Sequence, residues 1–204
     1  MAAQQQTGRR MRSDGERSRQ AILTAAGKLA TVDGLDGLTI GRLADHIGMS
    51  KSGLYAHFGS KEELQLATVA AAEEVFEADV IEPAQASPAG LARLDAYVEG
   101  FFDHVERGAF PGGCFFTSVI AEFDTRPGRV RDRVAGYVGT WVGHLAEQAA
   151  EAQRLGQIAP DADIEQIVFE IESALLGANT LWVLNGDASA FDRARTAIAS
   201  RVKR

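Results

Sequence analysis

The chain has 204 residues, 46% of them hydrophobic, which is enough for one or two domains with a buried core. The single cysteine, Cys114, excludes an internal disulfide and a cysteine-based zinc site, and four scattered histidines lack metal-ligand spacing. We therefore expect no metal and no cofactor. No apolar run approaches about 18 residues and no apolar signal segment opens the chain, so we expect a cytoplasmic protein without a membrane span.

The net charge of −7 excludes a general binder of polyanions, but the charge is unevenly distributed. Residues 1–61 hold nine Lys and Arg against five Asp and Glu, a net +4, whereas residues 62–204 hold 12 against 23, a net −11. This asymmetry indicates nucleic-acid contact by the N-terminal end only.

Residues 1–16 are polar and predict a disordered basic arm. The basic side chains just before the first predicted helix are Arg9, Arg10, Arg12 and Arg17. Two interpretations stay open for them: a solvated tail, or an arm that reaches DNA phosphates or the adjacent minor groove.

The first helix is predicted over 18–32, and two short helices follow within 39–58. Thr39 and Ser50 are good N-caps, and Gly48 between them ends the first short helix. A helix of seven or eight residues cannot stand alone in water. The pair therefore predicts a helix-turn-helix, whose second helix enters the DNA major groove. Ser60 with Glu63 predicts a capping box that opens the next helix.

Apolar spacing and breaks at Gly and Pro predict the remaining helices. Their ranges are 60–81, 88–105, 114–123, 128–155, a helix that opens at Asp161 or Asp163 and runs to 185, and a last helix that ends near Val202. Ser87 as N-cap and Pro88 as first helical residue predict the start of the helix at 88–105. No strand pattern and no repeat is present, so the fold class is all-α with nine helices.

The string SKSGLYAHFGSKEEL from Ser50 resembles the recognition-helix signature of the TetR (tetracycline-repressor) family. AILTAAGKLA, Gly34 and LTIGRLADHIGM fit the same family upstream, so the resemblance covers residues 18–70. PGGCFF and EFDTRPG resemble a C-terminal domain type of some members. The resemblance implies a DNA-binding domain at 17–77 and a ligand-binding and dimerisation domain at 78–204.

Gly53 inside a helix costs about 1 kcal/mol relative to Ala, and close approach to DNA would explain it. Lys61 opposes the helix dipole, so phosphate contact is expected. Tyr55 and His57 either pack on the helix surface or, as the resemblance implies, bind phosphates. Besides the arm, the predicted DNA-binding residues are Thr39, Lys51, Ser52, Gly53, Tyr55, His57 and Lys61.

Three glycines inside one predicted helix, Gly136, Gly139 and Gly143, together cost about 3 kcal/mol in helix propensity. Close helix packing and room for a ligand both explain them. Aromatic residues gather in the same region, as a core or as the wall of a cavity, with a few polar groups such as Glu122 nearby. The predicted ligand-binding residues are Tyr97, Phe101, Phe115, Phe116, Trp141, His144, Asn179 and Trp182.

The last two helices carry long apolar stripes, and two copies can form a four-helix bundle, as the resemblance implies. The predicted dimerisation residues are Ile171, Leu175, Leu181, Phe191 and Ile198.

These features predict a homodimeric repressor that a small apolar or aromatic effector releases from a palindromic operator in double-stranded DNA. The alternative is a DNA-binding regulator without such a ligand, controlled by a protein partner or by its own abundance. An enzyme is disfavoured, because Cys114 with His104 or His144 lacks an orienting group and an oxyanion site. A redox role for Cys114 at a helix start stays open.

Overall fold

The computed structural model describes residues 2–123 and 125–202, and of residues 2–14 it describes only the course of the backbone. The elements are α1 (Ala2–Asp33), α2 (Ile40–Ile47), α3 (Lys51–Phe58), α4 (Lys61–Phe76), the π-helical turn η1 (Glu77–Ile81), α5 (Glu82–Ala84), α6 (Leu91–Glu106), α7 (Phe115–Phe123), α8 (Arg129–Arg154), α9 (Ile164–Asn185) and α10 (Ser189–Val202). These residues include no strand, which confirms the predicted all-α class.

The elements α4, η1 and α5 follow one another without a break, from Lys61 to Ala84. Counted as one, they bring the described residues to the nine predicted helices. The wider π turn lies just before Pro83, whose ring has no N–H to continue the ordinary hydrogen-bond ladder.

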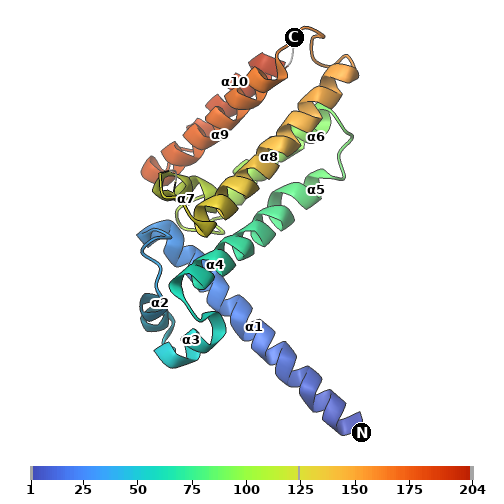
Figure 1. The fold of residues 1–204 in the computed structure, drawn as a ribbon. Coiled ribbons are helices and arrows are strands. Elements are labelled where there is room, and N and C mark those ends of the chain that lie inside the picture. The colour runs from blue at the N-terminus through green and yellow to red at the C-terminus, as the bar shows by residue number, and fades with distance from the viewer. Residues whose placement is uncertain (1, 124, 203–204) are drawn as a thin grey trace.

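Two regions are joined by this long helix (Figure 1). The first comprises α1, α2 and α3, and α4 packs on α1. The second comprises α6 to α10, in which α8 packs on α4, α6 and α9, and α9 lies along α10. The core is continuous through both, because the buried apolar side chains of the two regions belong to one cluster.

Two predicted helix starts are wrong. Helix α1 begins at Ala2 and not near Ser18. The segment that was expected to be a disordered arm is therefore the first part of this helix. Ala, Gln, Arg and Met favour helix, and no proline interrupts the segment. Helix α6 begins at Leu91 and not at Pro88, with Gly90 before it at φ 92°. The amide of Gly90 donates to the Gln148 side chain at 3.1 Å, a long-range partner that local sequence does not reveal.

Among the described residues one helix, α9, is long and apolar enough to cross a membrane by length and composition, contrary to the sequence expectation. A core helix of a soluble protein passes the same test. Helix α9 also packs on α8 and α10 and carries Glu170 and Glu172. Its length alone therefore gives little support for a membrane span.

Candidate nucleic-acid interface and effector cavity

Side-chain caps build the two short helices. The Thr39 hydroxyl accepts a hydrogen bond from the Arg42 amide at 3.1 Å, and the Ser50 hydroxyl accepts one from the Gly53 amide at 3.1 Å. Between them Gly48 takes φ 70°, a left-handed conformation that glycine adopts without strain. The predicted N-caps and turn of the helix-turn-helix are confirmed.

Helix α1 fixes the end of α3. Leu54 is fully buried and Phe58 nearly so. Arg19 of α1 donates from Nη1 to the His57 carbonyl at 2.9 Å, and its guanidinium lies 4.6 Å from the centre of the Phe58 ring. One side chain thus satisfies an end carbonyl of α3 and packs on its last apolar ring.

The opposite side of α3 is open to solvent. We call its exposed residues Lys51, Ser52, Tyr55 and Ala56 the recognition face. Tyr55 is 59% exposed, an unusual position for a large ring. Of the other predicted residues on this helix, Gly53 and His57 are half-buried. The fold therefore leaves Lys51 and Ser52, two of the predicted DNA-binding residues, exposed to solvent.

Gly53 has a reason inside the protein. A Cβ there would lie 3.0 Å from the Ser50 hydroxyl that caps the helix. This tight contact favours glycine for a reason that does not involve DNA, and the close approach of Gly53 to DNA stays a prediction.

Lys61 also has a partner inside the protein. Its Nζ lies 3.1 Å from the Asp36 carboxylate, which also binds Arg126 at 2.6 Å. Hydrogen bonds from Arg126 and then Lys61 lower the pKa of Asp36 below its ordinary value. The argument that only phosphate contact explains Lys61 is therefore wrong, although the side chain remains partly exposed.

The predicted arm is only partly described. The side chains of Arg9, Arg10 and Arg12 lie outside the described residues, and Arg17 is exposed on α1.

Only one of the two hydrogen bonds of the predicted capping box is present. The Ser60 hydroxyl accepts from the Glu63 amide at 3.1 Å, but the Glu63 carboxylate binds Arg129 of α8 at 2.7 Å. A long-range cation replaces the reciprocal local bond.

Glu122 of α7 holds the loop that leads into α2. Its Oε1 accepts from the Leu35 amide at 3.1 Å and its Oε2 from the Asp36 amide at 3.0 Å. Gly34, at φ 87°, lets the loop approach this closely, because a Cβ there would lie 2.9 Å from Oε2. We call this contact the loop clamp, and it joins the second region to the helix-turn-helix.

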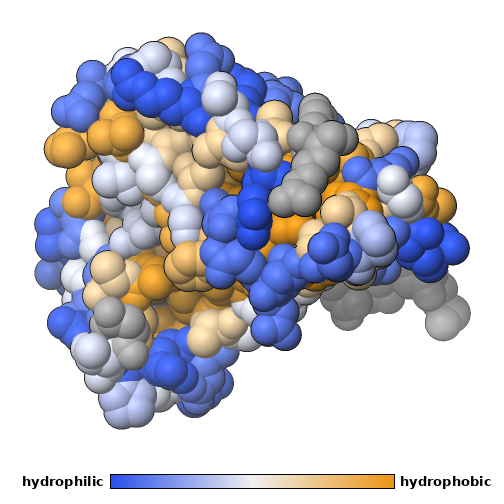
Figure 2. Space-filling model, turned by 90° about the horizontal axis from the view of Figure 1, so that it is seen from above, coloured by the Kyte–Doolittle hydropathy of each residue, from blue (hydrophilic) through white to orange (hydrophobic). Residues whose placement is uncertain are grey.

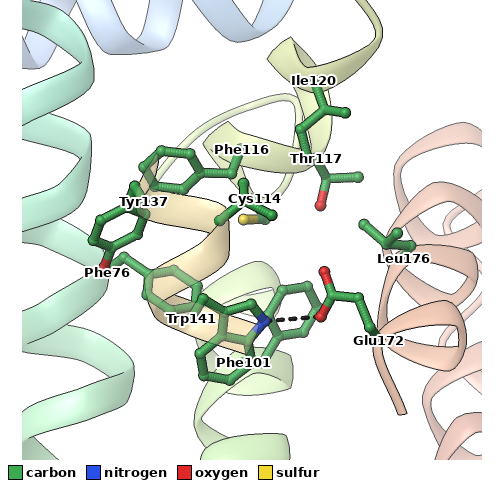
Figure 3. A pocket seen from close by; sticks show the side chains of 11 residues that line it. Phe76, Phe101, Cys114, Phe116, Thr117, Ile120, Tyr137, Trp141, Glu172 and Leu176 are labelled. Atoms are coloured by element: carbon green, nitrogen blue, oxygen red, sulfur yellow. Dashed lines mark hydrogen bonds between the residues drawn. The ribbon is translucent and has the colours of Figure 1, made fainter. Parts of the chain in front are cut away.

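A cavity lies among α4, α6, α7, α8 and α9 (Figure 3). It is lined by Phe76, Phe101, Cys114, Phe116, Thr117, Ile120, Tyr137, Val138, Trp141, Glu172 and Leu176. With its mouth it encloses about 320 Å³ of atom-free space, but only about 20 Å³ can admit the centre of a water molecule. That is room for about one water, so a larger occupant requires side chains to move.

Five rings form one wall, which we call the aromatic cage: Phe76, Phe101, Phe116, Tyr137 and Trp141. Phe76 lies at its centre, with ring centroids 5.1 Å from Trp141 and 6.1 Å from Tyr137 in edge-to-face geometry. Phe116 stacks on Tyr137 at 4.5 Å. The Tyr137 hydroxyl is directed away to Glu77, to which it donates at 3.0 Å.

The polar group of the cavity is Glu172 of α9. Its Oε2 accepts from Trp141 Nε1 at 2.8 Å, and its other oxygen lies toward Thr117 (Figure 3). Burial raises the pKa of Glu172, and the Trp141 bond only partly offsets this. Of the described residues that line the cavity, none is Lys, Arg or His.

The predicted ligand-binding residues are divided by the fold. Phe101, Phe116 and Trp141 line the cavity, whereas the other five do not. Tyr97 lies behind Trp141 with its ring 5.8 Å away, and His144 lies beyond Tyr97.

The remaining three have interior roles. Phe115 packs on Phe110, and Trp182 packs on Phe191 with ring centroids 5.3 Å apart. Asn179, expected to orient a ligand, accepts from the Cys114 amide at 2.9 Å.

Sequence reasoning missed Phe76, Tyr137 and Glu172 as site residues. For Glu172 the signal was present: it stands between Val168 and Leu176 at four-residue spacing, a charge within an otherwise apolar stripe.

Cys114 is buried, and burial raises the pKa of its thiol, which disfavours the thiolate that a redox sensor needs. Within the described part of the chain no three His, Cys, Asp or Glu side chains are grouped as a metal site requires.

Neither close helix packing nor room for a ligand explains the three glycines of α8 within the protomer. Gly136, Gly139 and Gly143 are exposed, with open space where a Cβ would stand.

Four of the five predicted dimerisation residues are buried inside the protomer. Ile171, Leu175, Phe191 and Ile198 pack in its core, and only Leu181 is exposed, at 39%. Ile171 and Leu175 belong to the apolar stripe of α9, and Phe191 and Ile198 to that of α10, so the buried stripes of the two helices leave none of these four side chains to a partner.

A different set faces solvent, which we call the outer face of α9: Phe169, Ser173, Gly177, Thr180 and Leu184. Phe169 is 67% and Leu184 75% exposed. Figure 2 shows apolar patches at the surface among polar ones in its view of the molecule.

Comparisons with known proteins agree with this architecture. Residues 22–68 match the family model of bacterial regulatory proteins of the tetR family, and residues 90–198 match the tetracyclin repressor-like C-terminal domain. The transcriptional regulator AcuR of Cereibacter sphaeroides is 26% identical over 171 residues, which are 81% of this chain and 78% of AcuR.

Solved structures share the whole fold. A TetR transcriptional regulator from Chloroflexus aurantiacus superposes with a TM-score of 0.80 at 25% identity, over 92% of this chain and 95% of that one. AibR, solved with isovaleryl coenzyme A and operator DNA, gives 0.74 at 24% identity, over 90% and 97%. The C-terminal model alone covers more than half of the chain. The chain therefore belongs to the TetR family of DNA-binding transcriptional regulators, which are not enzymes.

Proposed function

We propose that this protein is a homodimeric repressor released from a palindromic operator by a small-molecule effector. The observation that carries the proposal is the course of α7. Phe116, Thr117 and Ile120 of this helix line the cavity, and Glu122 at its end forms the loop clamp on the helix-turn-helix. A change in the cavity therefore has a short, continuous route to the DNA-binding domain.

The recognition face of α3 would enter the major groove, as second helices of this motif do. Lys51 and Ser52 would contact base edges, and Tyr55 would contact phosphate. Thr39, His57, Lys61 and the arginines of the arm would add phosphate contacts, with Gly53 at the closest approach. Phosphate contacts position the protein, and base contacts specify the sequence.

The outer face of α9 would bind a second copy. Its exposed Phe169 and Leu184 supply apolar area, and Gly177 between them allows helices to approach closely. A two-fold pair of α9 and α10 would form a four-helix bundle and match a palindromic site. Two recognition helices would then reach successive major grooves, about 34–36 Å apart. A DNA target would place the protein in the cytoplasm.

Release would follow from unequal affinity. An effector shifts the protein only by binding one state better than the other. Widening the aromatic cage would move α7. Because Glu122 of α7 forms the loop clamp, the loop before α2 would move with it. AibR, which shares the fold, was solved with both a small molecule and operator DNA, so this architecture accommodates both.

One observation favours the alternative, a regulator controlled by a protein partner or by abundance. The cavity has room for about one water molecule, far less than a drug-sized ligand needs. Under this alternative the cage is only core, and no small molecule would change operator affinity.

The test begins with selection of bound fragments from random and genomic DNA by the full chain. A palindromic consensus is expected. The labelled operator complex is then exposed to a small-molecule library, and dissociation is compared for wild type and Phe76→Trp, which fills the cavity. Hits that release wild type but not the filled variant support the proposal. A library without hits, together with unchanged operator affinity in the filled variant, favours the alternative.

A further inference from the structure

The chemistry of the cavity narrows the class of molecule it would hold. Five ring faces and edges border it, and the one ionisable side chain among them able to carry a full charge near neutral pH is Glu172. Each ring has a negative face that attracts cations. A ring that turns its face to the cavity can therefore attract a cation, and a carboxylate lies at one end of the wall.

Among the residues that the structure describes, no cation pairs with the Glu172 carboxylate. Its hydrogen bond from Trp141 is neutral, and none of the described side chains around the cavity is basic. Partial burial makes the charged form of this carboxylate costly and raises its pKa. An occupant that brought a positive charge would remove this cost.

Other classes fit less well. A carboxylate, phosphate or acyl-coenzyme A head would add a negative charge beside Glu172, and the described lining of the cavity offers no Arg, Lys or His to bind it. A neutral hydrocarbon would fill the cage but bring no charge to balance the Glu172 carboxylate, whose free oxygen lies toward Thr117 (Figure 3).

We propose that the aromatic cage and Glu172 form a binding site for an organic ammonium cation. The cation would lie against the rings of Phe76, Trp141 and Phe101, with Glu172 as its counter-ion. The space for one water molecule marks where the charged head begins to enter, and ring rotations admit its alkyl groups. That this cation is the effector rests on the proposed function; that it binds does not.

The test uses three molecules of one shape and three charges: tetramethylammonium, tert-butanol and pivalate. Their binding to the full chain is measured by calorimetry and by fluorescence in a Trp182→Phe background, which isolates Trp141. We expect tetramethylammonium to bind about tenfold or more tighter than tert-butanol, and pivalate to bind most weakly.

The decisive variant is Glu172→Gln, which keeps an oxygen to accept from Trp141 and removes the charge. It should weaken tetramethylammonium about tenfold and leave tert-butanol unchanged. Glu165→Gln, an exposed change on the same helix, is the matched control and should alter neither. Circular dichroism establishes that both variants fold.

Tetramethylammonium binding that is undetectable, equal to that of tert-butanol, or insensitive to Glu172→Gln overturns the proposal. Operator release is measured separately. If the cation binds through Glu172 but leaves the operator complex intact at saturation, the ammonium site stands and effector release by it fails.

Discussion

The helix-turn-helix and the C-terminal region place their functional side chains in opposite ways. The first exposes the recognition face on α3, a helix whose ends are capped by Ser50 and by Arg19. The second gathers side chains from five helices around a cavity, with Glu172 and Phe76 brought together from positions far apart in sequence. A site displayed on one short helix is determined locally, whereas a site enclosed by several helices depends on how they pack.

The comparison extends to the apolar faces of α9. Ile171 and Leu175 are fully buried in the protomer, and Phe169 is mostly exposed. Both sets are apolar, so hydrophobicity alone does not separate the core from the surface expected to meet a partner.

The largest effect should come from breaking the outer face of α9. Phe169→Asp with Leu184→Asp should give folded monomers, because a charge at a paired apolar surface remains unpaired and buried. Operator affinity should fall by about a hundredfold or more, since one half-site is lost. Sedimentation and DNA binding measure both effects. Leu155→Asp, another exposed apolar position, is the control and should remain dimeric. Ile171→Asp, by contrast, should unfold the protomer; a folded monomer from that change would contradict the assignment of faces.

The recognition face gives the next largest effect. Lys51→Ala should cost about 1–3 kcal/mol and relax sequence preference at one base pair. Tyr55→Ala should weaken all sequences alike and leave preference intact, because a phosphate contact carries no sequence information. Binding to the selected operator and to single-base variants distinguishes the two. Arg107→Ala in the other region is the control, and an equal loss in that variant would refute the assignment.

The loop clamp tests how the two regions are joined. Glu122→Ala leaves the Leu35 and Asp36 amides without their acceptor, which should lower the free energy of unfolding by about 1–3 kcal/mol. Hydrogen exchange at these two amides should accelerate, and the response of the operator complex to effector should weaken. Glu106→Ala, an exposed carboxylate at the end of α6, is the control. Unchanged exchange at Leu35 and Asp36 would mean that the clamp is not maintained in solution.

The smallest effect concerns Glu172 in the empty protein. Burial raises the pKa of this carboxyl, so the folded chain binds a proton that the unfolded chain releases above its ordinary pKa of 4.5. Wild-type stability should therefore decline relative to Glu172→Gln as pH rises from 4.5. Near neutral pH the variant should therefore be the more stable of the two and melt at the higher temperature. Parallel melting curves from pH 4 to pH 8 would show instead that the carboxylate is well solvated.

Much of the candidate DNA interface was predictable from sequence. The caps Thr39 and Ser50 and the turn at Gly48 act within three or four residues, so their hydrogen bonds follow from local spacing. The residues that line the cavity were less predictable. Trp141 and Asn179 both stand on apolar helix faces, yet one lines the cavity and the other binds the Cys114 amide. Their different positions depend on how the helices pack, and the periodicity of the sequence does not specify that packing.

The sequence by itself determined the all-α class, the helix-turn-helix and the family, because periodicity, capping and turn residues are local properties of the chain. Only the tertiary structure decided which apolar face of α9 is core, that Lys61 pairs with Asp36, that Glu122 holds the loop before α2, and that Glu172 faces five rings. Each of these is a contact between residues far apart in the chain. Burial, ion pairing and pKa depend on such neighbours, which no local pattern specifies.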